Sequence, residues 1–188
     1  MTAARRSTLA CYTVALTVAC AAPAFAGDGA SGAVALTSAA FAEAQAIPAE
    51  SSCQGSDRSP ALAWTTDVTG IGSWTLIVDD PDAPGGTFVH WLAYDLPAQT
   101  RSLAPGVAPG DVITSGGRQG ANDFGSLGYR GPCPPKGRAP HHYRFRLYAL
   151  DQPTLGLPPA SKKGEVERAL EKHHVLASTV LTGTFERK

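Results

Sequence analysis

Residues 141–150 read HHYRFRLYAL and give the clearest strand pattern in the chain. Apolar and aromatic side chains occupy every second position, and Arg144 and Arg146 fall between them. Because successive side chains of a strand point to opposite faces, this pattern predicts a strand with one buried and one polar face. The predicted buried row consists of His141, Tyr143, Phe145, Leu147 and Ala149.

Shorter stretches on both sides predict further strands. The best are residues 73–78 (SWTLIV) and 88–94 (FVHWLAY), in which apolar side chains alternate. In the second stretch, alternation is expected to place on one face Phe88, His90, Leu92 and Tyr94. Weaker candidates are residues 33–37, 62–64 and 179–185. Several short strands separated by turns predict an antiparallel β-sandwich.

One helix is expected near the end of the chain, over residues 162–177. Pro158 and Pro159 end any preceding element, and the Ser161 hydroxyl can cap the first helical turn. Val166 and Leu170 recur at helical spacing. The predicted fold is therefore mainly β, a sandwich with this C-terminal helix packed on it.

The composition supports a folded domain and excludes some partners. Hydrophobic residues make up 43% of the 188 residues and charged residues 17%, which is not the composition of a disordered chain. The 20 glycines and 15 prolines favour turns and short strands over a helical bundle. Lysine and arginine together number 16, as do the acids, so the net charge is zero. Without a basic footprint, no nucleic-acid partner is expected.

The first 26 residues have the pattern of a secretory signal peptide. Arg5 and Arg6 precede an uncharged apolar stretch, 8–22, and Ala24-Phe25-Ala26 forms a cleavage site. We expect cleavage after Ala26, one domain over residues 27–188, and a periplasmic or secreted protein. No membrane span is expected, because the apolar stretch is short. A retained anchor, a lipoprotein formed through Cys20 and twin-arginine export remain alternatives.

Two of the four cysteines remain after such a cleavage. Cys11 and Cys20 would leave with the signal, so Cys53 and Cys133 form an even pair in an oxidising compartment. A Cys53–Cys133 disulfide is the expected outcome, with two buried free thiols as the alternative. Without a C-x-x-C motif, the pair does not predict a zinc site.

Three segments concentrate residues that can bind a ligand: 79–84 (DDPDAP), the pair His90-Trp91, and the proline-rich stretch 128–137 leading to His141. A solvated turn and a core histidine are the plainer explanations for the first two. If the strands lie close together, the two histidines, Asp80, Asp82 and Tyr143 line one pocket with apolar walls. Histidine donors suit an anionic oxygen, and a neighbouring aspartate would raise the pKa of an imidazole. The long segment 105–131, with eight glycines, is expected to be a functional or elaborated surface loop.

At these residues the chain resembles the phosphatidylethanolamine-binding proteins, in their bacterial Raf-kinase-inhibitor-like branch. The two central matches are 80–84 (DPDAP) with His90-Trp91, and 128–135 with 141–145 (HHYRF). Residues 53–64 (CQGSDRSPALAW) and 174–177 (HVLA), followed by Gly183, also match. The resemblance covers nearly all of residues 27–188.

The resemblance implies a two-sheet antiparallel β-fold with a small anion-binding cavity. It implies that this cavity accepts phosphate, phosphorylethanolamine or acetate-like groups. By position, Asp80, Asp82 and His90 match the first cavity motif of the family. Gly131, His141 and Tyr143 match the second, and the rim is formed by Pro84 and Cys133.

The leading hypothesis is an exported, non-enzymatic binding protein for a phosphorylated or carboxylated ligand, such as a phospholipid headgroup. An inhibitor or interaction module for an unidentified envelope or extracellular protein is the alternative. A hydrolase or phosphotransferase using Asp80 and His90 is less favoured, because the chain contains no G-x-S-x-G, P-loop or H-E-x-x-H motif. The donors Asp80, Asp82, His90 and His141 could bind a metal, but their spacing matches no known site. We therefore expect no catalytic residue, metal or cofactor.

Overall fold

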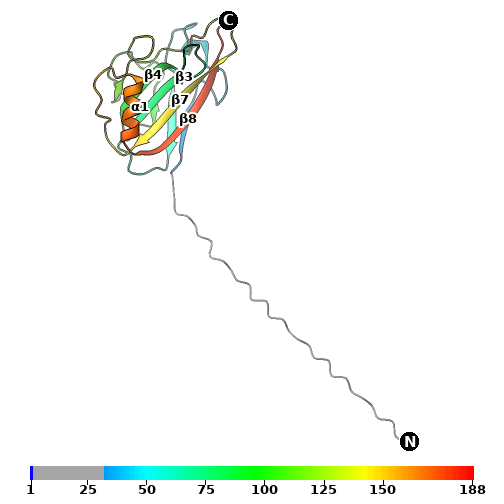
Figure 1. The fold of residues 1–188 in the computed structure, drawn as a ribbon, viewed down its shortest axis with the longest axis vertical. Helices are drawn as coiled ribbons and strands as arrows, with labels where there is room; N and C mark the ends of the chain where they lie inside the picture. Colours follow the sequence, from blue (N-terminus) through cyan, green and yellow to red (C-terminus); the bar gives the residue numbers. More distant parts are fainter. Residues whose placement is uncertain (2–31) are drawn as a thin grey trace. The chain divides into compact units, whose positions relative to one another are not determined.

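The computed structural model describes Met1 and residues 32–188 of the chain. The expected signal peptide, its cleavage after Ala26 and the alternative lipoprotein cysteine, Cys20, lie outside the described residues. Residues 32–188 form two antiparallel sheets and one helix (Figure 1), as the sequence predicts.

The smaller sheet has three strands in the order β1-β2-β5. They are β1 (Val34–Ser38), β2 (Leu62–Thr66) and β5 (Ser102–Leu103). A short 3-10 helix, η1 (Ala49–Ser51), lies in the connection between β1 and β2. The first two strands fall within one or two residues of the expected positions, because both carry the alternating pattern.

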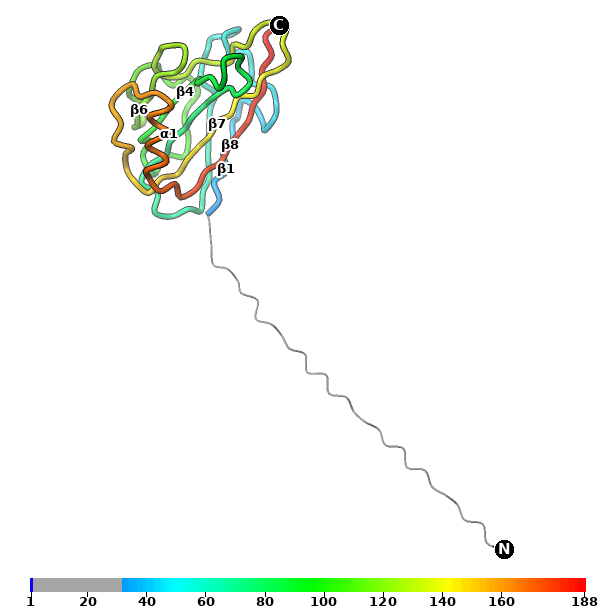
Figure 2. Tube along the Cα trace, in the orientation of Figure 1, coloured from blue at the N-terminus to red at the C-terminus, as the bar shows by residue number. Residues whose placement is uncertain are grey.

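The larger sheet has five strands in the order β6-β4-β3-β7-β8, and every neighbouring pair is antiparallel. Its strands are β3 (Ser73–Asp80), β4 (Phe88–Pro97), β6 (Arg118–Gln119), β7 (His141–Leu150) and β8 (Val175–Phe185). The prediction for β7 is confirmed at both ends, and its alternating row is buried as expected. At the margin of this sheet, the early strand β1 lies beside the late strand β8 (Figure 2).

The main core fills the space between the two sheets. It is rich in aromatic side chains, with Trp64 of β2 meeting Trp74 of β3 edge to face at 5.7 Å between ring centroids. Phe41, which follows β1, contacts Phe145 of β7 at 5.3 Å. Large aromatic side chains bury much apolar area, so this layer supplies most of the hydrophobic stabilisation.

The helix α1 (Lys163–Lys172) covers the other face of the larger sheet, as Figure 1 shows. It is shorter than predicted, because residues 175–177 pair with β7 and extend β8 instead. The expected cap is also wrong. The helix begins after Lys162, whose N–H is bound by the Glu165 carboxylate, while the Ser161 hydroxyl donates to the Pro158 carbonyl.

A buried ion cluster joins this helix to the sheet. The Asp79 carboxylate is fully buried and accepts hydrogen bonds from Arg144 Nε at 2.9 Å, Arg146 Nη2 at 2.6 Å and Lys163 Nζ at 3.1 Å. Burial alone would raise the pKa of Asp79, but these cations outweigh burial and hold it below its usual value. Glu167 of the helix binds Arg146 and Lys163. The cluster therefore fixes α1 at one position on the sheet.

Candidate functional site

The ends of three neighbouring strands deliver the polar groups of the site. Asp80 ends β3, His90 stands near the start of β4, and His141 begins β7. Because β3 is antiparallel to both neighbours, its last residue lies beside their first residues. Three titratable side chains therefore lie together at the same end of three neighbouring strands, and all three come from the strands themselves.

A β-bulge sets the direction of His90. Val78 pairs with Trp91 and Asp79 pairs with Val89, so His90 is the extra residue between them. The bulge reverses the alternation that the sequence predicts for this strand, because Leu92 and Tyr94 join the core under α1 and not the face of Phe88. The expectation of one shared face is therefore wrong. Bulges of this kind commonly redirect a side chain at a functional site.

Asp80 and His141 form a buried pair. The Nδ1–H of His141 donates to Asp80 Oδ2 at 2.8 Å, and both side chains are less than a tenth exposed. The other carboxylate oxygen, Oδ1, accepts the Asp82 N–H at 2.8 Å. With Nδ1 engaged, His141 has only Nε2 available for a further partner.

His90 has a different first partner. Its Nδ1 lies 2.7 Å from the Arg130 carbonyl oxygen, which can only accept, so Nδ1 carries the hydrogen. Burial lowers the pKa of His90, although the Arg130 carbonyl and the charge of Asp80 act in the opposite direction. The charge of Asp80 therefore acts on the pKa of His90 in the expected direction, but burial outweighs it and the net shift is downward. The neutral ring leaves an unshared electron pair on Nε2.

Tyr143 supports the site from within the core. Its ring is 1% exposed and meets the His90 ring edge to face at 5.1 Å between centroids. Within the described residues its hydroxyl has no hydrogen-bond partner. Burial and the charge of Asp80 raise the pKa of Tyr143, so the hydroxyl stays protonated. A buried O–H without a partner is a group that a bound water or ligand would satisfy.

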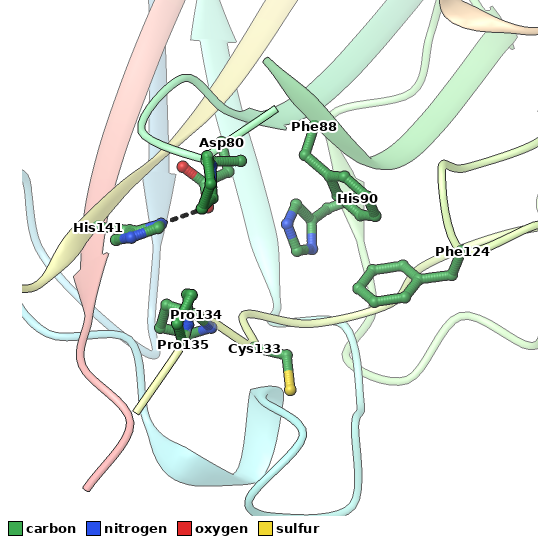
Figure 3. A pocket seen from close by; sticks show the side chains of 10 residues that line it. Asp80, Phe88, His90, Phe124, Cys133, Pro134, Pro135 and His141 are labelled. Atoms are coloured by element: carbon green, nitrogen blue, oxygen red, sulfur yellow. Dashed lines mark hydrogen bonds and ion pairs between the residues drawn. The ribbon is translucent and has the colours of Figure 1, made fainter. Parts of the chain in front are cut away.

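Asp80, His90 and His141 line a cavity of about 290 Å³. Figure 3 shows the His141–Asp80 pair on one side, the His90 ring nitrogens facing inward, and Pro134 and Pro135 opposite. The lining consists of Asp80, Ala83, Pro84, Phe88, His90, Phe124, Cys133, Pro134, Pro135 and His141. The walls are thus mainly apolar, with three convergent polar side chains.

Three predicted site residues lie outside this lining: Tyr143, which packs against His90 from the core, and Asp82 and Gly131, which act on the framework of the site. Asp82 Oδ2 accepts both the backbone N–H and the Nδ1–H of His142 at 2.8 Å, which fixes the β3–β4 turn to the start of β7. The His142 backbone N–H is the main cause of the lowered pKa of Asp82. The Gly131 N–H donates to Asp57 Oδ1 at 2.6 Å, and a β-carbon at Gly131 would lie 2.1 Å from the Ser51 carbonyl oxygen.

Sequence reasoning missed the aromatic wall as part of the site. Phe88 and Phe124 meet edge to face at 4.8 Å between centroids, and each ring lies 5.4 Å from the His90 ring. Phe124 is 43% exposed and comes from the long glycine-rich segment, where the Asn122 side chain holds its turn through five hydrogen bonds. The expectation that this segment is elaborated pointed to the region, but not to Phe124.

A disulfide closes one side of the cavity. Cys53 follows η1 and is bonded to Cys133, which lies in the cavity lining, as the cysteine pattern predicts. Between residues 32 and 188, no group of three or more His, Cys, Asp or Glu side chains could hold a metal ion. Within the same residues, no helix is long and apolar enough to cross a membrane.

Comparison with known proteins gives consistent results. The sequence profile described as "Phosphatidylethanolamine-binding protein" matches residues 37–186. An Aquifex aeolicus protein named "UPF0098 protein" is 44% identical over 147 residues, which are 78% of this chain and 85% of the relative. The Mycobacterium tuberculosis protein named "Putative lipoprotein LppC" is 39% identical over 78% of this chain and 69% of its own length. The crystal structure of Escherichia coli YbcL, titled a new member of the mammalian PEBP family, superposes with a TM-score of 0.75 at 32% identity. That superposition covers 82% of this chain and 99% of YbcL.

Proposed function

The chain belongs to the phosphatidylethanolamine-binding protein family, and we propose that it is an exported, non-enzymatic binding protein for a small phosphorylated or carboxylated anion. One observation carries the proposal. Asp80, His90 and His141 converge from three strands on a cavity whose other walls are apolar. Such a combination of apolar walls and few polar groups is typical of a site that orients a small ligand.

The polar groups suit an anionic oxygen. His141 is bound to Asp80 through Nδ1, so its Nε2 is the ring nitrogen that can bond to a ligand oxygen. The Tyr143 hydroxyl, buried behind the lining and close to Asp80, can donate a further hydrogen bond. Arg130 contributes through its carbonyl to His90, while its guanidinium binds Asp57 at 2.7 Å. The site therefore offers an anion hydrogen bonds rather than a free cationic side chain.

The neutral His90 adds a requirement for a proton. Its Nε2 faces the cavity with an unshared pair, which an ionised oxygen would repel. A proton between Nε2 and the ligand oxygen removes this repulsion, whether it belongs to the imidazole or to the ligand. We therefore expect anion binding to be accompanied by proton uptake.

The size and lining of the cavity support a headgroup-sized ligand and binding without turnover. At about 290 Å³ it lies just below the usual range for drug-sized ligands. Its lining residues include no serine, threonine or lysine, and Cys133 is disulfide-bonded. A nucleophile activated by a neighbouring base is the usual requirement for covalent catalysis, so this lining favours a binding role.

Two observations support export. Cys53 and Cys133 form a disulfide, and such bonds persist mainly in oxidising compartments. One relative bears a name that designates a lipoprotein. An extracytoplasmic location fits both observations, and the signal-peptide pattern of residues 1–26 is consistent with it.

A thermal-shift titration tests the proposal. Purified protein is titrated with inorganic phosphate, phosphorylethanolamine, phosphorylcholine and acetate. A ligand present at a hundred times its Kd should stabilise the fold by about 2.7 kcal/mol, which raises Tm by roughly 5–10 °C. The increase should be lost in His90→Ala. His174→Ala is the matched control, because this histidine is about three-quarters exposed and absent from the lining.

The change in Tm, compared between wild type and His90→Ala, shows whether the ligand binds in this cavity. An increase that survives in His90→Ala would place the ligand elsewhere. No increase with any of the four compounds would remove the proposed ligand class altogether.

A further inference from the structure

The two cysteines of the disulfide differ in exposure. Cys53 is exposed, whereas Cys133 is half-buried and stands between Pro132 and Pro134. Thiol–disulfide exchange requires an incoming thiolate to reach one sulfur, and access decides which sulfur is attacked. Because Cys53 is the more exposed residue of the two, we expect an external thiolate to reach it before Cys133.

The second sulfur has a partner that suits a leaving thiolate. Arg187 Nη1 lies 3.2 Å from Cys133 Sγ, within hydrogen-bond distance for sulfur. A guanidinium stabilises a thiolate beside it, and a more stable leaving thiolate departs faster. Arg187 is itself half-buried, so solvent screens this interaction only in part.

We propose that the Cys53–Cys133 bond is a thiol-exchange site, in which a small-molecule thiol or a reduced dithiol protein attacks Cys53. A bond forms between the incoming sulfur and Cys53 Sγ, and the Cys53–Cys133 bond breaks. The bonding electron pair leaves on Cys133 as a thiolate, which Arg187 stabilises. A second thiolate can then release Cys53 and leave the protein fully reduced. The first product is a mixed disulfide on Cys53.

Exchange at this site frees one wall of the cavity. Pro134 and Pro135 line the cavity, and the structure shows no hydrogen bond from residues 134–140 to another segment of the described chain. This stretch is therefore held at one end by the disulfide and at the other by β7. Its exposed residues include Lys136 and Arg138, which are potential trypsin sites.

Residues 130–132, which precede Cys133 in the chain, stay anchored when the disulfide opens. The Gly131 N–H donates to Asp57, and Arg130 exchanges two hydrogen bonds with His90. The Cys53 N–H also donates to the Pro132 carbonyl at 3.1 Å. We therefore expect a local opening at 134–140, with both sheets intact.

Reaction with reduced glutathione tests the proposal on the folded protein. Alkylation, digestion and mass spectrometry should find the glutathione adduct on the Cys53 peptide. Native trypsin treatment after the reaction should cleave at Lys136 or Arg138 several-fold faster than before it. Arg187→Gln should slow adduct formation about three- to tenfold, and Arg187→Lys should retain most of the rate.

A variant with Cys53→Ser and Cys133→Ser provides the control for the opened state. It should be cleaved at Lys136 or Arg138 at the faster rate with no thiol present and keep the circular dichroism of a β-protein. An adduct on Cys133, or a disulfide that reacts only after unfolding in urea, would overturn the proposal. Neither readout uses a cavity ligand, so failure here is separate from failure of the proposed function.

Discussion

At the scale of single residues, the site depends on how two histidines are paired. His141 gives its Nδ1–H to a carboxylate, while His90 gives its own to a backbone carbonyl. A carboxylate favours the protonated imidazole, whereas burial against a neutral carbonyl favours the neutral ring. Each side chain therefore reaches the cavity through its Nε2, and the Nε2 of the neutral His90 ring is an acceptor. An oxygen ligand that carries or attracts a proton is complementary to both.

The lowered pKa of His90 makes stability depend on pH. In the unfolded chain His90 takes up a proton near pH 6.5, whereas the folded chain resists protonation to lower pH. The stability from neutral His90 is therefore complete above about pH 6.5 and is lost as pH falls below it. Urea unfolding at pH 7.5 and pH 5.5 should show a larger loss in wild type than in His90→Gln. Equal losses in the two proteins would contradict a buried neutral His90.

Gly131 packs tightly against the backbone of Ser51, and a substitution there tests this contact. A β-carbon there would lie 2.1 Å from the Ser51 carbonyl oxygen and 2.8 Å from Asp57 Oδ1. Gly131→Ala should therefore reduce the free energy of unfolding by about 1–3 kcal/mol or more, because backbone has to move. Gly85→Ala is the control, since nothing lies within 4 Å of its β-carbon position. A Gly131→Ala protein with wild-type stability in urea would show that this contact is not tight.

Particular residues show how much of the site the sequence could predict. Asp80, His90 and His141 could be proposed because each stands beside a proline-containing turn or begins an apolar row. Phe124 could not, since its position depends on Asn122 holding a turn in a long segment without periodicity. The partner of Asp80 could not be predicted either, because strand order and the bulge at His90 decide which histidine it meets.

At the scale of secondary-structure elements, packing against the sheet decides the boundaries. Residues 175–177 continue a helical pattern in the sequence, yet they pair with β7 and belong to β8. Strand β3 is buried along its whole length, because one face contacts the inter-sheet core and the other contacts α1. Period-two alternation in the sequence predicted these strands well. The bulges and the exact strand ends could not be predicted in this way, because they depend on how the strands pair in the folded sheet.

The ion cluster under α1 gives a prediction at this scale. Asp79→Ala would leave Arg144, Arg146 and Lys163 without their central carboxylate. Removing one partner of a buried ion cluster costs about 3–5 kcal/mol, and we expect a loss of this size in urea unfolding. The lowered pKa of Asp79 also means that its contribution is complete above about pH 4 and is lost at lower pH.

Asp111→Ala is the matched control for the ion cluster. Its carboxylate lies 4.0 Å from Arg118, and both side chains are more than two-fifths exposed. Exposed pairs contribute at most about 1 kcal/mol, so this variant should stay close to wild type. Similar losses for Asp79→Ala and Asp111→Ala would contradict a specific role for the buried cluster.

At the scale of the whole molecule, the fold positions the cavity, and the side chains around the cavity determine its chemistry. Two sheets with an aromatic core hold three strand ends in register, so the site stands on rigid elements. The loops add the aromatic wall at Phe124 and the proline wall beside Cys133. A shared fold does not determine function, so the ligand has to be tested at the cavity itself.

Anion binding coupled to proton uptake at His90 can be measured by calorimetric titration with phosphorylethanolamine at pH 8, in buffers of different ionisation enthalpy. The phosphate is fully ionised there, because its second pKa is about 6. We expect binding with uptake of up to one proton in wild type, and weaker binding with little uptake in His90→Gln. Absence of binding, or binding in which the heat is independent of the buffer, would contradict this expectation.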